Sequence, residues 1–519
     1  MSEKRNIIFI FPDQHRGNAV GFINPAVITP NLDKLASEGV VFERCQTNSP
    51  LCMPARASMM SGQYVGKHGC WNNNSGSDAD PNGPSHVRDV REAGYHTAII
   101  GKDHLAHFPV GIKREDRRKW YWDTLNKGWG FDEPLTTHTS QSLVNAFPKM
   151  PPRGEPSYPQ ILEEQGLMNA QREYMIEYFD KCHKGEIMPW DEPPSPLPPK
   201  YHLDSYVGQR AVKWIDEYSD DRPFYLQVNF PGPHDPFDSP QEYRDRYRLE
   251  DIPVGKMDRL SGLIAPYVQN VSNWSNIKDM TEEQYKRGCI NYYALVTLID
   301  EQIGNIIKAL EDRGIADNTW IIYNSDHGEM LGDHFLRHKI VFYEEAVNVP
   351  CIIRPPGGIS GWRSAALVET VDMSATMLDI SGGKMAEGTP GESLREKVLL
   401  GPDHEKAQEG KNYVFSEVNG YCMVRDDRYK LVVALYSKLA DVATMRNITR
   451  EEQDAEIPVE MYDLQDDPKE LKNVVNEPGY RPVQEQLMEV LHQHIAENLD
   501  RERLINVLTA PNDGKFGMS

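Results

Sequence analysis

The chain has 519 residues, of which 39% are hydrophobic and 26% are charged, a composition typical of a globular protein. Its formal net charge of -22 argues against nucleic acid and anionic membranes as partners, because both would repel it. No stretch approaches the roughly 18 apolar residues of a membrane span. The first residues lack the pattern of a signal peptide, so we expect a cytoplasmic protein. An anionic substrate would therefore need a local pocket of positive charge.

The cysteines are scattered, odd in number and without a C-x-x-C pair. They are residues 45, 52, 70, 182, 289, 351 and 422. This pattern predicts no disulfide framework and favours a reducing compartment.

Short apolar strands alternate with amphipathic helices from the N-terminus to about residue 353. The expected strands are residues 6–12, 40–42, 96–100, 224–230, 319–324 and 349–353. The expected helices are residues 30–38, with Thr29 as N-cap, 87–93, 204–218 and 292–310. This alternation predicts an α/β fold, in which a large and mainly parallel sheet is sandwiched by helices.

Two regions depart from this alternation. Residues 110–203 are rich in proline, tryptophan and charge, and we interpret them as an insertion over one side of the core, either an active-site cover or a plain surface excursion. Beyond about residue 385, strand-like segments (412–417, 421–424 and 429–434) lead to a helix over 483–498. We therefore predict a catalytic α/β domain over residues 1–385 and a smaller C-terminal sheet-plus-helix domain over 386–519.

Polar residues follow four of the apolar strands directly. They are Asp13 and Gln14 after the first strand, Lys102 and His104 in GKDHL, His234 in PGPHDPF, and Asp326 and His327 in SDHGE. A single aspartate after a strand is more often a turn or helix cap. Ligands of open α/β sheets sit beyond the carboxyl ends of the strands, however, so the four together predict a metal and catalytic site.

The predicted metal ligands are Asp13, Asp326 and His327, with Gln14 as a neutral ligand. Carboxylate and amide oxygens favour a hard divalent cation such as calcium. The imidazole of His327 favours manganese or zinc, so the identity of the metal stays open.

A possible nucleophile lies in SPLCMPARASMMSGQ, residues 49–63, where Cys52, Pro54 and Arg56 form a C-x-P-x-R pattern. Pro54 suits a first helical turn and Gly62 suits the end of the helix. Cys52 would then lie at a helix N-terminus, which favours anions, with Arg56 one turn further on. The alternative is a buried structural cysteine at a helix start.

SPLCMPARASMMSGQ resembles the signature of the sulfatase family, within the alkaline phosphatase superfamily, whose C-x-P-x-R cysteine is converted to formylglycine. The segments NIIFIFPDQ, TPNLDKLASEGVVF, AGYHTAIIGKDHL, SDHGEMLGDH, HKIVFYEE and EMYDLQDDPKELKNV resemble family landmarks in the same order. The resemblance implies an alkaline-phosphatase-like fold and hydrolysis of a small anionic sulfate ester. It also implies a formylglycine-generating enzyme as the partner in maturation.

The resemblance also implies a role for each matching residue. Cys52 would become the formylglycine and a metal ligand, and Arg56 would stabilise it. Lys102, Lys339 and Asn73 would bind the substrate anion, and His104 and His234 would act on the nucleophile or the leaving group. His334 and His338 are predicted to be structural. One hydroxyl of hydrated formylglycine attacks sulfur, and deprotonation of the other releases sulfate.

Two positions depart from the pattern of many sulfatases, which carry Asp-Asp after the first strand and Asp-Asn after the late one. Asp13-Gln14 and Asp326-His327 instead resemble the branch with choline sulfatases and phosphonate monoester or phosphodiester hydrolases. An arylsulfatase-like sulfuric ester hydrolase is the leading hypothesis, and a phosphonate monoester or phosphodiester hydrolase is the alternative.

A third hypothesis from another class is a non-catalytic anion-binding protein with an unmodified Cys52. The branch also implies a homo-oligomer. The tail, residues 508–519, would then be either an exchanged arm or disordered.

Overall fold

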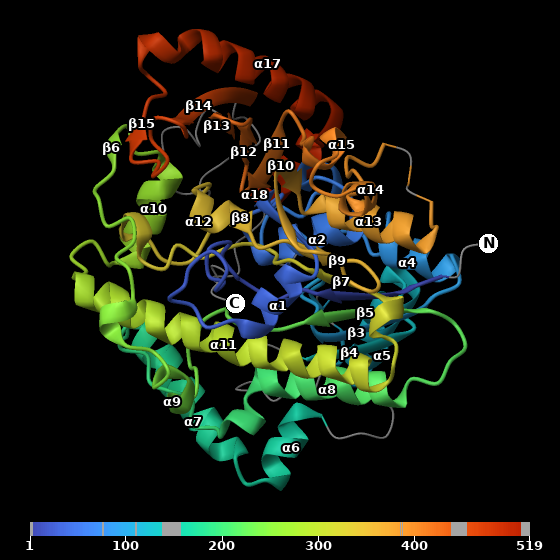
Figure 1. Cartoon of the computed structure of the whole chain (residues 1–519). Coiled ribbons are helices and arrows are strands. Elements are labelled where there is room, and N and C mark those ends of the chain that lie inside the picture. The colour runs from blue at the N-terminus through green and yellow to red at the C-terminus, as the bar shows by residue number, and fades with distance from the viewer. Residues whose placement is uncertain are drawn as a thin grey trace.

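The computed structural model describes residues 4–74, 77–108, 112–137, 157–384, 386, 388–436 and 454–509. A nine-stranded sheet crosses the molecule in the order β10-β2-β9-β7-β1-β5-β3-β4, with β8 paired to β2 (Figure 1). The strands are β1 (Asn6–Ile10), β2 (Val40–Gln46), β3 (His96–Lys102), β4 (Glu133–Thr137), β5 (Phe224–Asn229), β7 (Thr319–Tyr323), β8 (Asn348–Val349), β9 (Ile352–Arg354) and β10 (Trp362–Glu369). Pairing is parallel except where β9 meets β2 and β7 and where β8 meets β2. The predicted α/β class with a mainly parallel sheet is confirmed.

Strand β1 is buried on both faces, which explains its unbroken apolar sequence. Ile7 and Phe9 belong to one hydrophobic layer, whereas Ile8 and Ile10 belong to the opposite layer. Side chains alternate along a strand, so both faces of the sheet must be covered by helices.

Helices cover each face of the sheet as expected (Figure 1). The layer around Ile7 and Phe9 takes residues from α2 (Cys52–Ser61), α4 (His86–Glu92) and α13 (Val371–Ser381). The layer around Ile8 and Ile10 takes residues from α1 (Pro30–Ser37), α8 (Leu203–Glu217) and α11 (Glu282–Asp312). This sandwich fixes the carboxyl ends of the parallel strands at one edge of the core.

The C-terminal part of the chain forms a small antiparallel sheet with a helix packed against it. Its strands are β11 (Val414–Val418), β12 (Tyr421–Arg425), β13 (Tyr429–Tyr436) and β14 (Asp454–Asp463), in that order. Helix α17 (Arg481–Asn498) packs Leu487, Leu491 and Ile495 into one hydrophobic core with residues of this small sheet. Helix α18 (Arg501–Thr509) follows. Of the tail over residues 508–519, the first two residues belong to α18, and residues 510–519 lie outside the described residues. The domain boundary near residue 385 stays a prediction.

Three elements differ from their predictions. The strand expected over 349–353 is two strands, β8 and β9, because Pro350 between them has no N–H to donate. Helix α11 begins ten residues earlier than expected, since Thr281 and Gln284 form a capping box there. The segment 110–203 is more than an excursion, because β4 within it pairs with β3 at the sheet edge. That segment also contains α5 (Arg114–Asp123), α6 (Tyr158–Glu164) and α7 (Met168–His183), while residues 109–111 and 138–156 are outside the described ranges.

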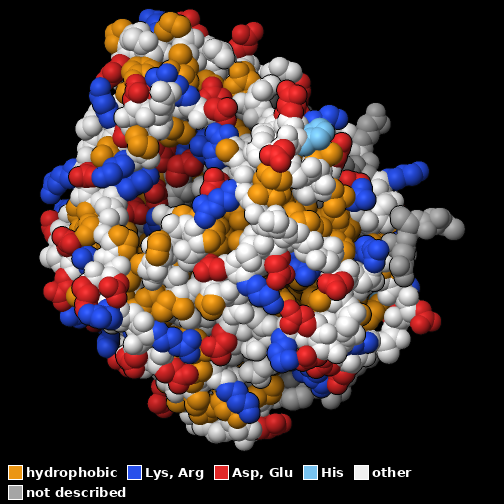
Figure 2. All heavy atoms as spheres, viewed as in Figure 1, with side chains coloured by type: hydrophobic (Ala, Val, Ile, Leu, Met, Phe, Trp, Pro, Cys, Tyr) orange, Lys and Arg blue, Asp and Glu red, His pale blue; other side chains and the backbone are white. Residues whose placement is uncertain are grey.

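Acidic and basic side chains are interspersed over the face in Figure 2, with hydrophobic side chains in scattered groups between them. Of the helices in the described part of the chain, none is long and apolar enough to cross a membrane.

Helix α1 is capped from another helix. Thr29 stands at the N-cap position as predicted, but its side chain makes no capping bond to α1. Instead, the buried carboxylate of Asp300 in α11 accepts hydrogen bonds from the backbone N–H groups of Asn31 (3.1 Å) and Leu32 (2.8 Å). Asp300 therefore satisfies the free donors at the start of α1 and ties α1 to α11.

We expect Asp300→Ala to lower the free energy of unfolding by about 2–3 kcal/mol, because it leaves buried N–H donors without an acceptor. Chemical denaturation measures this loss. The matched control is Glu301→Ala, which removes an exposed carboxylate that pairs with Arg246 at 3.5 Å and should change stability by less than about 0.5 kcal/mol. Equal losses in the two variants would contradict the capping role.

Candidate active site

Cys52 is the first residue of α2, and Gly62 ends that helix in the left-handed conformation at φ 68°. Both positions agree with the prediction from the C-x-P-x-R motif. The adjacent backbone N–H of Met53 donates to Asn73 Oδ1 at 3.1 Å. Cys52 is fully buried, so its reactivity depends on the side chains around it.

The loop before Cys52 is held by Asn48. The Asn48 amide donates to Glu369 Oε1 (3.0 Å) at the end of β10 and to the carbonyl of Phe415 (3.1 Å) in β11. Its Oδ1 accepts from the hydroxyl of Thr370 at 2.8 Å. Both sheets therefore fix the segment that delivers Cys52.

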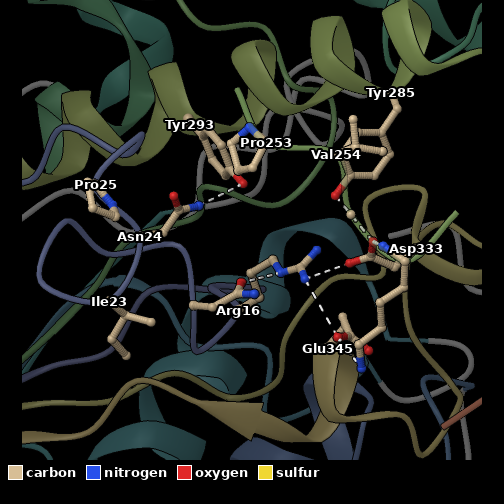
Figure 3. Close-up of a pocket in the computed structure, with 13 residues that line it drawn as sticks. Arg16, Ile23, Asn24, Pro25, Pro253, Val254, Tyr285, Tyr293, Asp333 and Glu345 are labelled. Carbon is tan, nitrogen blue, oxygen red and sulfur yellow. Dashed lines mark hydrogen bonds and ion pairs between the residues drawn. The ribbon is translucent and has the colours of Figure 1, made fainter. Parts of the chain in front are cut away.

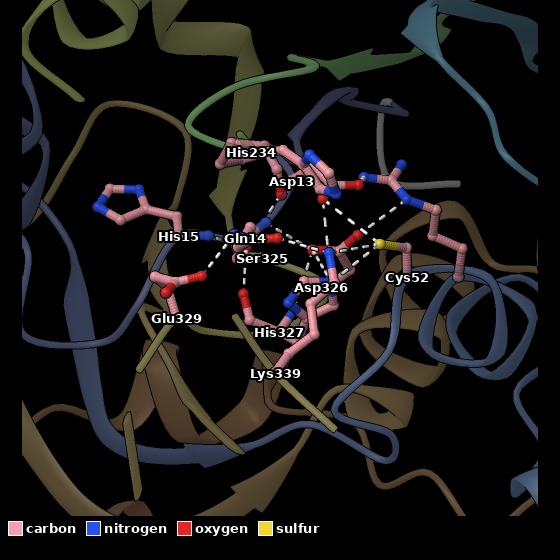
Figure 4. Close-up of polar contacts among 12 residues, drawn as sticks. Asp13, Gln14, His15, Cys52, His234, Ser325, Asp326, His327, Glu329 and Lys339 are labelled. Atoms are coloured by element: carbon pink, nitrogen blue, oxygen red, sulfur yellow. Dashed lines mark hydrogen bonds and ion pairs between the residues drawn. The ribbon is translucent and has the colours of Figure 1, made fainter. Parts of the chain in front are cut away.

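Three side chains from distant parts of the chain meet the Cys52 sulfur (Figure 4). His327 Nε2 and Lys339 Nζ each lie 3.1 Å from Sγ, and Asp13 Oδ1 lies at 3.6 Å. Asp13 follows β1, and His327 follows the neighbouring strand β7. The carboxyl ends of the strands thus meet at Cys52, in the geometry that the sequence predicts.

Arg56 binds both carboxylates of the cluster. Its Nε donates to Asp326 Oδ2 at 2.9 Å, and its terminal nitrogen donates to Asp13 Oδ2 at 3.0 Å. Lys102 Nζ lies 2.8 Å from the same oxygen of Asp13. These four side chains are at most 3% exposed. Each buried charge is paired with an opposite one, which offsets the cost of removing it from water.

The two carboxylates differ in pKa. Burial opposes the ionisation of Asp13, but Lys102, Arg56, His234 and Lys339 outweigh it and hold the pKa of Asp13 well below its usual value. Burial, and then the negative charge of Asp13, raise the pKa of Asp326 to about 6. The negative charge of Asp13 therefore disfavours the ionised form of Asp326, as expected for two carboxylates in one site.

The thiol of Cys52 is acidic for a buried cysteine. Burial and Asp13 raise its pKa, but Lys339, Lys102 and a hydrogen bond with His234 outweigh them and lower the pKa to about 7. The surroundings therefore stabilise negative charge at the position of Sγ.

The donor set fits a divalent cation. One ligand atom from each of Asp13, Cys52, Asp326 and His327 lies within 4.8 Å of the others, and all four residues are buried. Gln14 donates through Nε2 to Glu329 at 2.5 Å, which turns its Oε1 toward Lys339 and the cluster. Carboxylate and amide oxygens with one imidazole suit calcium, manganese or zinc.

The other predicted residues lie around this cluster. Burial, and then Lys102, hold the pKa of His104 well below its usual value, so its imidazole is neutral. Asn73 is 8% exposed, and its Nδ2 has no hydrogen-bond partner within the described ranges. His234 Nδ1 bonds to the carbonyl of Asp235 at 2.8 Å. His334 stacks on Tyr343 with ring centroids 4.3 Å apart.

Sequence reasoning missed three residues that orient the site, namely Asn48, Asp235 and Glu329. Glu329 lies three residues after Asp326 in SDHGE, and Asp235 directly follows His234 in PGPHDPF, so position within the motifs was the available signal. Asn48 is four residues before Cys52, and only the tertiary contacts reveal its role.

A separate cavity of about 290 Å³ lies around Arg16, three residues beyond Asp13 (Figure 3). It is lined by Arg16, Asn18, Ile23, Asn24, Pro25, Pro253, Val254, Gly255, Lys256, Tyr285, Tyr293, Asp333 and Glu345. Arg16 pairs with Asp333 at 2.7 Å, and Lys256 pairs with Glu345 at 2.8 Å. Both cations of this cavity are thus paired with carboxylates, whereas Lys339 in the Cys52 cluster contacts the Gln14 amide and the Cys52 sulfur.

Comparison with known proteins agrees with the geometry of the site. Residues 5–383 match the sulfatase family, and residues 332–497 match the C-terminal region of N-sulphoglucosamine sulphohydrolase. An arylsulfatase of Clostridium perfringens is 26% identical over 514 residues, covering 94% of each chain. A choline-sulfatase of Rhizobium meliloti is 28% identical over 498 residues, covering 92% of this chain and 83% of the relative.

Among solved structures, a phosphonate monoester hydrolase of Agrobacterium radiobacter matches with a TM-score of 0.74 and 23% identity, over 96% of both chains. The chain belongs to the sulfatase family. It is a sulfuric ester hydrolase with the alkaline-phosphatase-like fold expected from the sequence.

Proposed function

We propose that the protein hydrolyses sulfate monoesters in the manner of an arylsulfatase, with formylglycine at position 52 as the nucleophile and one divalent metal ion. The observation that carries the proposal is the setting of Cys52, which begins a helix and lies 3.1 Å from both His327 and Lys339. Maturation then requires a formylglycine-generating enzyme as a partner. Assembly as a homo-oligomer and a cytoplasmic location stay predictions.

Asp13, Asp326 and His327 would hold the metal, with Gln14 as a neutral ligand and position 52 completing the set. Calcium is favoured by the oxygen donors, and manganese or zinc are the alternatives. Hydrated formylglycine would supply a hydroxyl nucleophile, which the metal ion would make more acidic.

The side chains around Cys52 divide the remaining tasks. Lys102 and Lys339 provide positive charge for the sulfate oxygens, and Asn73 Nδ2 offers them a free donor. Arg56 keeps Asp13 and Asp326 in place through its two bonds. These cations form the local positive pocket that a chain of net charge -22 needs for an anionic substrate.

Two histidines would handle protons. His234 is among the groups that lower the pKa of the Cys52 thiol, so it lies next to the reacting group, and it would act on the leaving group. A neutral His104 could accept a proton from the second hydroxyl of the hydrate, since its pKa lies well below the usual value.

The alternative substrate is a phosphonate monoester or phosphodiester. It is favoured by the pairs Asp13-Gln14 and Asp326-His327, which carry fewer carboxylates than the usual sulfatase pattern. All three esters bring one negative charge to the site, whereas a phosphate monoester brings nearly two and should fit less well.

The substrate class is tested by kcat/KM for an aryl sulfate and for an aryl phosphonate monoester with the same leaving group. The enzyme should be co-expressed with a formylglycine-generating enzyme. We expect the sulfate to be preferred by about 100-fold or more, which corresponds to about 2.7 kcal/mol in transition-state binding. A preference for the phosphonate would move the protein to the phosphonate and phosphodiester branch.

The metal ligands are tested with Asp326→Asn, which removes one ligand charge and should lower metal content and kcat together. Metal content is measured by elemental analysis of the purified protein. The control is Asp333→Asn, a buried carboxylate seven residues further on that pairs with Arg16 at 2.7 Å, and it should keep its metal. Unchanged metal content in Asp326→Asn would refute the ligand assignment.

A further inference from the structure

Two histidines share one carboxylate oxygen beside the Cys52 cluster. Asp235 Oδ1 lies 3.3 Å from His234 Nδ1 and 3.2 Å from His338 Nδ1. The backbone carbonyl of Asp235 also lies 2.8 Å from His234 Nδ1. Both oxygens therefore engage the Nδ1 edge of the His234 ring, which leaves Nε2 as the ring nitrogen on the other edge.

Asp235 is held as a carboxylate by its two partners. Burial opposes its ionisation, but His234 first and His338 next outweigh it, and the pKa of Asp235 is held well below its usual value. The side chains of the three residues are only 9–16% exposed, so water screens the interaction weakly.

The second partner connects Asp235 to the opposite wall of the site. The backbone N–H of His338 donates to Glu329 at 2.6 Å, and its ring lies 4.5 Å from that of Trp274. Lys339, the next residue, contacts the Cys52 sulfur. Asp235 therefore links the loop that carries His234 to the segment that carries Lys339.

We propose that Asp235 is a positioning residue for leaving-group protonation, which fixes the ring of His234 with a proton on Nδ1 and with Nε2 facing the departing oxygen. The proposal rests on the proposed function and deepens it. A carboxylate behind an imidazole sets both the tautomer and the orientation of the ring.

As the hydroxyl of the formylglycine at position 52 forms its bond to sulfur, the bond from sulfur to the ester oxygen breaks, and that oxygen keeps the electron pair and takes the proton from Nε2 of the imidazolium form of His234. The alcohol leaves, and the imidazole is neutral with its Nδ1–H still bound to Asp235. Such assistance matters most for leaving groups that are poor without a proton.

Asp235→Asn is tested with two substrates that differ in leaving group, phenyl and para-nitrophenyl esters of the preferred acid, sulfate or phosphonate. We expect kcat/KM to fall about 100-fold for the phenyl ester and less than about tenfold for the activated para-nitrophenyl ester. A general loss of structure would lower both rates by the same factor. Equal losses would therefore overturn the proposal.

Asp238→Asn is the matched control. Asp238 lies three residues further along the same loop, is buried, and faces another histidine, His202, at 3.5 Å. The substitution makes the same change of charge, so any loss of rate should be equal for the two esters. A leaving-group dependence as strong as that of Asp235→Asn would contradict the specific role of Asp235.

His234→Gln provides a second measurement, which can be made even if the single variant Asp235→Asn does not fold. His234→Gln should show the same dependence on the leaving group, and adding Asp235→Asn to it should cost less than about threefold more. Full additivity of the two losses would overturn the proposal. If the wild-type enzyme hydrolysed neither the sulfate nor the phosphonate, the proposed function itself would fail, which is a different result from equal losses in the variant.

Discussion

The structure depends on one buried arrangement of charges, in which Arg56 binds Asp13 and Asp326 at the ends of two adjacent strands. All three side chains are at most 1% exposed. Removing such charges from water costs several kcal/mol per ion, so the fold must keep each one paired. Helix α2 supplies the partner Arg56 one turn after Cys52, and β3 ends at the partner Lys102, which lies beside Asp13. The position of Cys52 thus follows from the pairing of its neighbours.

The small C-terminal sheet supports this arrangement without contributing a residue to it. Lys430 in β13 is fully buried, donates to the carbonyl of Phe342 at 2.8 Å and pairs with Glu344 at 2.7 Å. These contacts hold the segment that follows Lys339. From the other side, Asn48 anchors the loop before Cys52 to β11. Both halves of the site therefore contact the same antiparallel sheet, which lies within the residues 332–497 that match the C-terminal region of N-sulphoglucosamine sulphohydrolase.

Strong local patterns made the core predictable from the sequence. The apolar run of β1 and the C-x-P-x-R motif each determine a local conformation, and the carboxyl ends of parallel strands must meet at one edge. Residues whose role depends on distant partners could not be predicted. Asp300 caps a helix some 270 positions away in sequence, and Asp235 binds His338 across the site. Pro350 divides the strand predicted over 349–353. The sequence does not show this, because the effect of a proline in a strand depends on whether its backbone nitrogen faces a neighbouring strand.

The proposed reaction depends on Cys52, once it is converted to formylglycine, as the nucleophile. The most direct measurement is the mass of the tryptic peptide over residues 45–56, made on preparations with different extents of conversion, alongside kcat for an aryl sulfate. We expect a form about 18 mass units lighter than the cysteine form, with kcat proportional to its fraction. Full activity in a preparation whose Cys52 is entirely unmodified would contradict it.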